Sequence, residues 1–218
     1  MLLAFDTATP AVTVALHDGT HVLAETTAID ARRHGELLAA AIEALLAGAG
    51  ASWRDITAVA SGTGPGPYTG LRAGLVTARV LGSALGVPVY GVCSLDVIAA
   101  DAAAAAGGRE FVVATDARRR EVYWARYDAA GARLAGPDVG RPADVAAAAG
   151  PVPVAGTGPV LYPDLLGEGI GPAYPSAAAL ARLAAAQIAA GTAATGADPV
   201  YLRRPDARVP GPPKRVTA

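Results

Sequence analysis

The order of apolar segments in the first hundred residues constrains the fold more than any other feature of the sequence. A fully apolar run at Leu2–Phe5 predicts a strand covered on both faces, and alternating segments around Asp18-Gly19 predict a hairpin. Further along, apolar residues at helical spacing alternate with short apolar runs. The predicted strands are 2–5, 12–16, 21–25, 56–61 and 87–92, and the predicted helices are 34–47, 69–85 and 94–106.

This order predicts an α/β fold built on one mixed sheet. Strands joined by tight turns must run antiparallel, whereas strands separated by helices add in parallel through right-handed crossovers. We therefore expect a mixed five-strand sheet with helices on its faces.

Gly107-Gly108 predicts the boundary between this unit and a smaller one. Strands again precede helices after it, so 107–200 is predicted to be an abbreviated structural repeat of 1–106. The tail 201–218 is basic and proline-rich, and we expect a loose extension there. The strands predicted in the second unit are 110–115, 121–127, 133–135 and 152–155, and its helices are 144–149 and 177–190, the latter capped by Ser176.

Charge and cysteine content exclude several classes of protein. The chain has 18 Lys and Arg against 19 Asp and Glu, a formal charge of −1, which argues against a protein that holds nucleic acid alone. A single cysteine, Cys93, cannot form an internal disulfide, so we expect a cytoplasmic protein and not a disulfide-stapled secreted module. No stretch of about 20 apolar residues runs without charge, so no membrane span is predicted.

The turn after the first strand contains Asp6, Thr7 and Thr9. In actin-like ATPases and sugar kinases an Asp at such a turn faces metal-bound phosphate. The glycine that lets the backbone approach phosphate in those proteins is replaced by Ala8 in this sequence or has no counterpart. An Asx turn between two hairpin strands explains the same residues. The sequence leaves both interpretations open.

The segment Gly62–Gly70 places four glycines and two prolines directly before a predicted helix. A glycine-rich loop that opens a helix can bind an anion, but the lysine of a Walker loop is missing, and the only lysine is Lys214. A rigid structural loop is the alternative. The helix that follows carries small residues at 70, 74, 78 and 82, which let another helix approach closely, inside this chain or in another subunit.

Other reactive residues indicate little chemistry. His17 and His21 flank a hairpin tip and not one helical face, so we predict no metal site. Cys93 sits in an apolar context and is expected to be inert. The run Arg118–Arg120 lies in a turn between two predicted strands, either as a solvated tip or as a cluster for RNA phosphate or a partner's acidic groups.

Taken together, several segments resemble the TsaB family, the bacterial partner subunit in threonylcarbamoyladenosine modification of tRNA. They span nearly the whole chain in the expected order, and the Gly-Pro loop and the Asp-Ala-Arg…Glu-Val-Tyr turn are the most specific. Arg120 departs from the family pattern, in which we expect glycine. The matching segments are Leu3–Thr9, His34–Leu38, Gly64–Arg72, Asp116–Arg118, Glu121–Tyr123 and Pro199–Arg203.

The resemblance implies an actin/Hsp70-like (ribonuclease H-like) fold in two lobes, with the second lobe abbreviated, and a subunit without catalytic activity of its own. It implies pairing with TsaD, which transfers threonylcarbamoyl to the tRNA adenosine beside the anticodon, and with TsaE, an ATPase. ATP and metal are expected on these partners, with no cofactor on this chain, and tRNA is expected to bind through the complex. The resemblance also allows a homodimer of the isolated chain.

In the family, the pairing surface uses the first two helices of the first lobe. A vestigial phosphate loop is expected at Asp6 and Thr7. The competing hypothesis is an enzyme, either an actin-like ATPase or kinase whose ATP binding depends on Asp6, or a glycoprotease-like metalloenzyme that holds zinc. The positions matching the pairing surface are His34, Leu37, Leu38, Ala41, Ile42, Leu45, Leu71, Gly74, Leu75, Ala78 and Gly82, and the candidate contacts to RNA or a partner are Arg118, Arg119, Arg120, Arg203 and Arg204.

Overall fold

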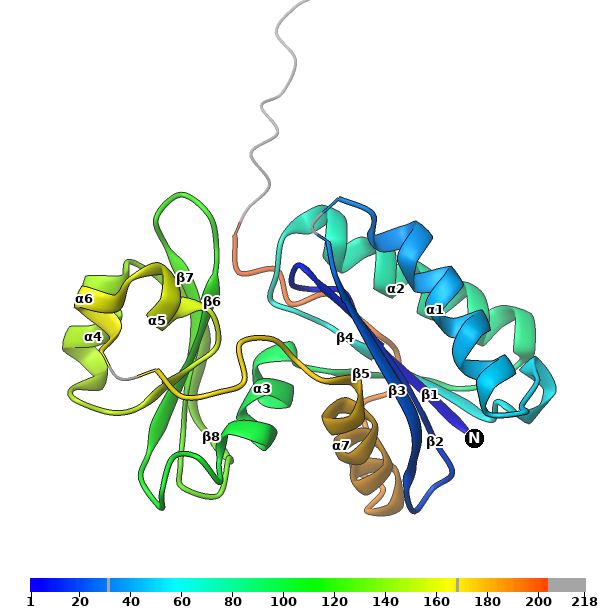
Figure 1. Cartoon of the computed structure of the whole chain (residues 1–218). Coiled ribbons are helices and arrows are strands. Elements are labelled where there is room, and N and C mark those ends of the chain that lie inside the picture. Colours follow the sequence, from blue (N-terminus) through cyan, green and yellow to red (C-terminus); the bar gives the residue numbers. More distant parts are fainter. Residues whose placement is uncertain (31, 168, 204–218) are drawn as a thin grey trace, which may run out of the picture.

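The computed structural model describes residues 1–30, 32–167 and 169–203 and contains two sheets, each flanked by helices (Figure 1). The first sheet, of order β3-β2-β1-β4-β5, comprises β1 (Leu2–Asp6), β2 (Ala11–His17), β3 (Val22–Ile29), β4 (Ala58–Gly62) and β5 (Val89–Val92). The second, of order β8-β7-β6-β9, comprises β6 (Phe111–Asp116), β7 (Val122–Tyr127), β8 (Arg133–Gly140) and β9 (Val154–Ala155).

The helices are α1 (His34–Gly48), α2 (Tyr68–Leu85), α3 (Ser94–Ala102), α4 (Pro142–Ala149), α5 (Gly158–Leu161), α6 (Pro163–Leu166) and α7 (Ala177–Ala189), with a 3-10 turn, η1, at Trp53–Asp55. In the described part of the chain, none of them combines the length and the apolarity that a bilayer crossing requires. Most bounds lie within two residues of the prediction. The helix predicted to reach 106 ends at Ala102 instead, and the short α5 and α6 were not predicted.

β1 forms the buried centre of the first sheet. It runs antiparallel to β2, with Phe5 opposite Val14, and parallel to β4, with Phe5 opposite Ser61. β3 adds antiparallel to β2, and β5 adds parallel to β4. Every residue of β1 and β2 is buried, as expected for strands covered on both faces. The predicted mixed five-strand sheet is confirmed, and the fold is actin/Hsp70-like.

Helices cover the two faces of this sheet differently. On one face, α1 and α2 lie side by side, and Leu38, Ile42 and Ala78 share a core cluster with Phe5 (Figure 1). On the opposite face, α7 packs through Leu180 against the apolar side chains of β1 and β2 that point the other way. The first lobe thus has three layers, with α1 and α2 on one face of the sheet and α7, which follows the second lobe in the sequence, on the other.

The helices α3 and α7 do not follow the predicted boundary at residues 106 and 107. α3 lies before it, yet Ile98 packs against Phe111 and Tyr127 of the second sheet. α7 lies after it, yet the N–H of Ala177 donates to the hydroxyl of Thr13 in β2 at 3.0 Å. The two sheets lie on either side of the predicted boundary, whereas each of these two helices buries its apolar face against the other unit's sheet.

The second lobe is a shortened version of the first. β6 pairs antiparallel with β7, β7 pairs antiparallel with β8, and the two-residue β9 adds parallel to β6. α4 and α6 cover its outer face through Val145 and Leu166, which pack on Val112 and Val154. This lobe has four strands against five in the first, as the abbreviated repeat requires.

Candidate functional site

Asp6 ends β1, and its side chain is completely buried inside the first lobe. One carboxylate oxygen, Oδ1, accepts a hydrogen bond from the N–H of Ala8 at 2.7 Å, and Oδ2 accepts one from the hydroxyl of Ser94 at 2.5 Å. Gly62 lies so close that a Cβ there would overlap Oδ2. Burial raises the pKa of the Asp6 carboxyl, and the bonds from Ser94 and Ala8 partly offset this. The carboxylate is therefore engaged within the protein.

Thr7 fastens the same turn to α2. Its hydroxyl donates to the carbonyl of Gly70 at 2.8 Å and accepts from the N–H of Gly74 at 3.0 Å. These two backbone groups are the partners of one i to i−4 helical bond, so the hydroxyl bridges the helix ladder. Asp6 and Thr7 thus serve internal packing, and the Asp6–Ala8 bond is the Asx turn that the sequence left open.

The Gly62–Gly70 loop is held rigidly between the turn and α3. Gly64 and Ser94 exchange two hydrogen bonds, one from the Gly64 N–H to the Ser94 hydroxyl at 3.1 Å and one from the Ser94 N–H to the Gly64 carbonyl at 2.8 Å. A Cβ at Gly66 would overlap the carbonyl of Ala8. Ser94 is the first residue of α3 and Cys93 its N-cap, and the Ser94 hydroxyl bonds Asp6 and Gly64 and not the helix backbone.

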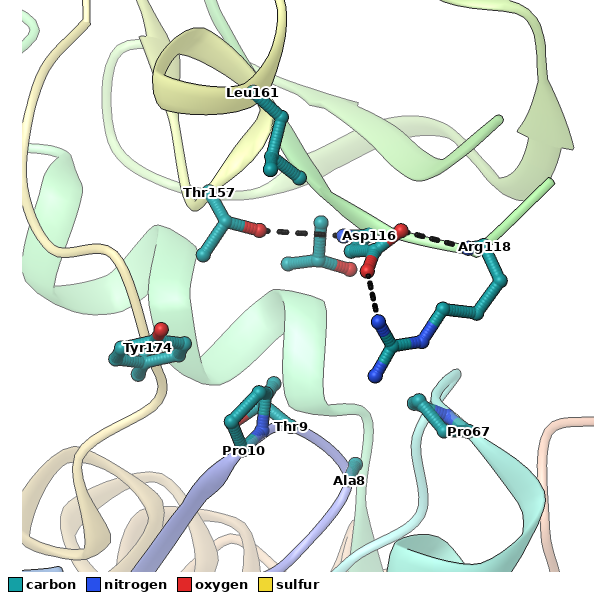
Figure 2. A pocket seen from close by; sticks show the side chains of 10 residues that line it. Ala8, Thr9, Pro10, Pro67, Asp116, Arg118, Thr157, Leu161 and Tyr174 are labelled. Atoms are coloured by element: carbon teal, nitrogen blue, oxygen red, sulfur yellow. Dashed lines mark hydrogen bonds and ion pairs between the residues drawn. The ribbon is translucent and has the colours of Figure 1, made fainter. Parts of the chain in front are cut away.

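A cleft of about 160 Å³ separates the two lobes beside this turn (Figure 2). Ala8–Pro10 and Pro67 form its first-lobe wall, and Asp116, Thr157 and Leu161 form its second-lobe wall. A further hollow of about 210 Å³ runs along the same turn past His34 and Thr69, and Arg118 lines both spaces.

The charged groups of this cleft neutralise each other. Arg118 Nη1 lies 3.1 Å from Asp116 Oδ2, and the Arg118 N–H donates to Asp116 Oδ1 at 2.7 Å. His34 is oriented by a 2.9 Å bond from Nε2 to the carbonyl of Thr9. In the part of the chain that the structure describes, no three His, Cys, Asp or Glu side chains gather as a metal site would need. Burial raises the pKa of the Cys93 thiol to about 11, so it stays protonated at neutral pH.

The turn at Arg118–Arg120 is strained and exposed. The φ angles of Arg118, Arg119 and Arg120 are 60°, 55° and 61°, a left-handed conformation that costs a residue other than glycine roughly 1–2 kcal/mol. All three side chains are exposed. The strain at Arg120 explains why a glycine is expected at this position.

The C-terminal strap, residues 196–203, ties the two lobes together. The N–H of Val200 donates to the carbonyl of Thr63 in the first lobe at 2.9 Å. Arg203 then donates to the carbonyl of Ala117 at 2.8 Å and forms an ion pair with Glu121, both in the second lobe. Arg203 therefore has partners within the chain, and its predicted contact to RNA or a partner stays a prediction. Arg204 lies outside the described residues.

Nine of the eleven residues predicted to form the pairing surface are buried within the chain. These nine residues lie inside the first lobe and not on its surface, which corrects the residue assignment, and pairing through the two helices stays a prediction. The small residues of α2 let that helix approach its own sheet, because a Cβ at Gly82 would overlap Val89 and one at Gly74 would lie 2.5 Å from Thr7 Oγ1. Leu37 and Ala41 are half-buried, and the nine buried residues are His34, Leu38, Ile42, Leu45, Leu71, Gly74, Leu75, Ala78 and Gly82.

The outward face of the same two helices carries apolar strips among its charged residues, and sequence reasoning missed them. Val76 and Val80 of α2 are 51% and 59% exposed, and Ala40 and Ala44 of α1 are exposed as well. Residues four apart share one side of a helix, so each pair forms a continuous strip. Glu36 and Glu43 on α1 and Arg79 on α2 are exposed beside these strips, so the charges of the outward face masked its apolar residues in the sequence pattern.

Comparison with known proteins shows which family shares this fold. Residues 21–196 match the family model TsaD, described as tRNA N6-adenosine threonylcarbamoyltransferase. The structure of YeaZ (TsaB) from Pseudomonas aeruginosa superposes with a TM-score of 0.79 at 32% identity, covering 92% of this chain and 99% of that one. The tRNA threonylcarbamoyladenosine biosynthesis protein TsaB of Escherichia coli K12 is 39% identical over 127 residues, 58% of this chain and 54% of that protein. The chain belongs to the TsaB family.

The family likeness extends over the whole fold. An uncharacterized protein of Mycobacterium tuberculosis H37Rv is 46% identical over 213 residues, 95% of this chain and 93% of that protein. Since the TsaD model covers more than half of the chain, this TsaB-family protein also belongs to the broader TsaD family.

Proposed function

We propose that the chain is a non-catalytic subunit in the biosynthesis of threonylcarbamoyladenosine in tRNA. It pairs with a tRNA N6-adenosine threonylcarbamoyltransferase, TsaD, and holds it in a productive complex that TsaE joins. The names of its TsaB relatives and of its family model support this pathway. ATP and metal belong to the partner subunits, and tRNA is engaged by the complex. Since tRNA is its target, we place the complex in the cytoplasm.

The observation that carries the non-catalytic assignment is the position of Asp6. A carboxylate that helps to bind a nucleotide must present at least one oxygen to the metal ion that joins it to phosphate. Both Asp6 oxygens instead accept hydrogen bonds from Ala8 and Ser94, and the side chain has no exposed surface. The cleft offers Asp116 and Arg118, which pair with each other. These groups suit a scaffold better than an ATPase, a kinase or a metalloprotease.

The outward face of α1 and α2 is the surface that we assign to pairing. Since the TsaD model matches residues 21–196, the transferase has a counterpart to both helices. Two such helix pairs can pack against one another as a four-helix contact, for which the Ala and Val strips supply close, apolar packing. The same face lets the isolated chain form a homodimer when the partner is absent.

Co-purification tests this assignment. Val76→Glu with Val80→Glu puts two charges on exposed positions, so the chain should fold while its complex with the transferase is lost. Val160→Glu is the matched control, because Val160 is 79% exposed on α5 of the other lobe. Retention of the complex by the double variant would move the pairing surface elsewhere. Tight ATP binding by the isolated chain that Asp6→Ala abolishes would replace the scaffold by an ATPase.

A further inference from the structure

Tyr68 and Arg72 at the start of α2 form an exposed cluster with Tyr201 of the strap, and the proposed pairing face does not include it. Tyr68 and Tyr201 stack with ring centroids 5.8 Å apart and an interplanar angle of 28°. The guanidinium of Arg72 lies 4.9 Å from the Tyr68 ring centre, and Nη1 donates to the Tyr68 hydroxyl at 2.6 Å. The three side chains form one ordered aromatic and cationic surface, here called the tyrosine rim.

The exposed fraction of Tyr68 and Tyr201 distinguishes this stack from a stacked pair in a hydrophobic core. The other stacked pair among the described residues, Phe111 and Tyr127, has similar geometry and is completely buried in the second-lobe core. Tyr68 and Tyr201 are 56% and 51% exposed. Half of each ring therefore stays in water in the free chain, although its orientation is fixed by the neighbouring ring and by Arg72. Such rings can accept another flat, apolar group without reorganisation.

The tyrosine rim is continuous with the arginine turn of the second lobe. Pro67 and Thr69, the neighbours of Tyr68, line the same hollow as Arg118. Two residues after Tyr201, the strap is bonded to Ala117, which adjoins Arg118. The rim and the exposed turn Arg118–Arg120 thus lie along one edge of the interlobe cleft. Aromatic faces beside several guanidinium groups match the stacked bases and phosphates of an unpaired RNA segment.

We propose that the tyrosine rim binds an unpaired segment of RNA, with a base stacked on the exposed tyrosines and phosphates held by Arg72 and by Arg119 and Arg120 of the exposed turn. That this RNA is tRNA rests on the proposed function. The net charge of −1 makes the interaction of the free chain weak, so the rim acts as one part of a larger RNA surface supplied by the complex.

Fluorescence anisotropy tests the proposal with two RNA probes, a labelled stem-loop of a tRNA anticodon arm and a blunt duplex of the same stem. Each is titrated with the transferase complex and, at low salt, with the free chain. Tyr68→Leu with Tyr201→Leu removes the stack but keeps apolar side chains. Loss of base stacking should weaken stem-loop binding about tenfold and leave duplex binding nearly unchanged. Trp53→Leu is the control, because Trp53 is also exposed, on η1.

Arg72→Gln supplies a second variant, which removes the positive charge beside Tyr68 and keeps both rings. It should lower the slope of log affinity against log salt by about 1, as expected when one phosphate contact is lost. Tyr68→Phe with Tyr201→Phe should retain stem-loop binding, since the ring faces remain. Stem-loop binding by the folded leucine variant that equals the wild type would overturn the proposal.

Loss of subunit association without any change in RNA affinity would assign the rim to a protein partner and also overturn the proposal. The proposed function fails if the wild-type chain forms no complex with the transferase. RNA binding by the free chain is titrated separately, so failure of the proposed function and failure of the RNA proposal are distinguishable.

Discussion

Replacing Gly74 by alanine should destabilise the fold, because α2 meets the β1–β2 turn at this position. The new Cβ would lie 2.5 Å from the Thr7 hydroxyl oxygen, whereas ordinary contact begins near 3.4 Å. The hydroxyl is held by bonds of 2.8 Å to the Gly70 carbonyl and 3.0 Å from the Gly74 N–H. A displacement large enough to relieve the overlap must therefore break or stretch both.

The expected loss is about 3 kcal/mol of unfolding free energy. Two buried hydrogen bonds contribute about 1 kcal/mol each. Overpacking adds about 2 kcal/mol, and the better helix propensity of alanine returns about 1 kcal/mol. For a chain of this length, each kcal/mol shifts the melting temperature by about 2–4 °C, so a fall of about 6–12 °C is expected.

Thermal unfolding followed by far-UV circular dichroism measures this shift. Gly35→Ala is the control, because a Cβ on Gly35 of α1 meets nothing within 4 Å, so only the helix propensity changes and stability should rise by up to about 1 kcal/mol. Thr7→Ala removes the obstructing hydroxyl, so Gly74→Ala should cost at least about 1 kcal/mol less in that background. A Gly74→Ala chain that melts like the wild type would refute the internal packing of the small residues of α2.

Three further substitutions test the roles of Asp6, Arg120 and Arg203. Asp6→Asn should keep the transferase complex intact in a co-purification experiment. The folded chain disfavours the charged form of Asp6, so the unfolding free energy of the wild type should fall relative to this variant as pH rises from 3.8 through the raised pKa of Asp6. Arg120→Gly should raise the melting temperature by a few degrees, since glycine relieves about 1 kcal/mol of strain at a φ of 61°, and an unchanged value would contradict that strain. Arg203→Ala should accelerate amide exchange in the 117–121 turn by freeing the strap, whereas Arg182→Ala on α7 should leave it unaltered.

The strand order of the first lobe could be predicted because the signals are local. The fully apolar Leu2–Phe5 requires cover on both faces, and Asp18-Gly19 fixes a hairpin beside it. No such local signal in the sequence predicts that α3 packs on the second sheet and α7 on the first. Both helices are rich in alanine with one apolar face, and nothing in that pattern states which sheet the face covers.

The candidate site was predicted less well for the same physical reason. The small residues of α2 indicate close helix packing, but the pattern is identical for a partner helix and for the chain's own sheet, and the buried Thr7 hydroxyl beside Gly74 decides between them. The stacking of Tyr68 on Tyr201 joins residues 133 positions apart, and no local pattern predicts a contact of that kind.

The central claim is that the chain supports threonylcarbamoylation of tRNA by pairing and not by chemistry of its own. Mass spectrometry of tRNA nucleosides from cells depleted of the chain tests it most directly. We predict that threonylcarbamoyladenosine falls on depletion and is restored by the wild type and by Asp6→Asn, but not by Val76→Glu with Val80→Glu. An unchanged level on depletion would contradict the claim, and so would restoration that requires the Asp6 carboxylate.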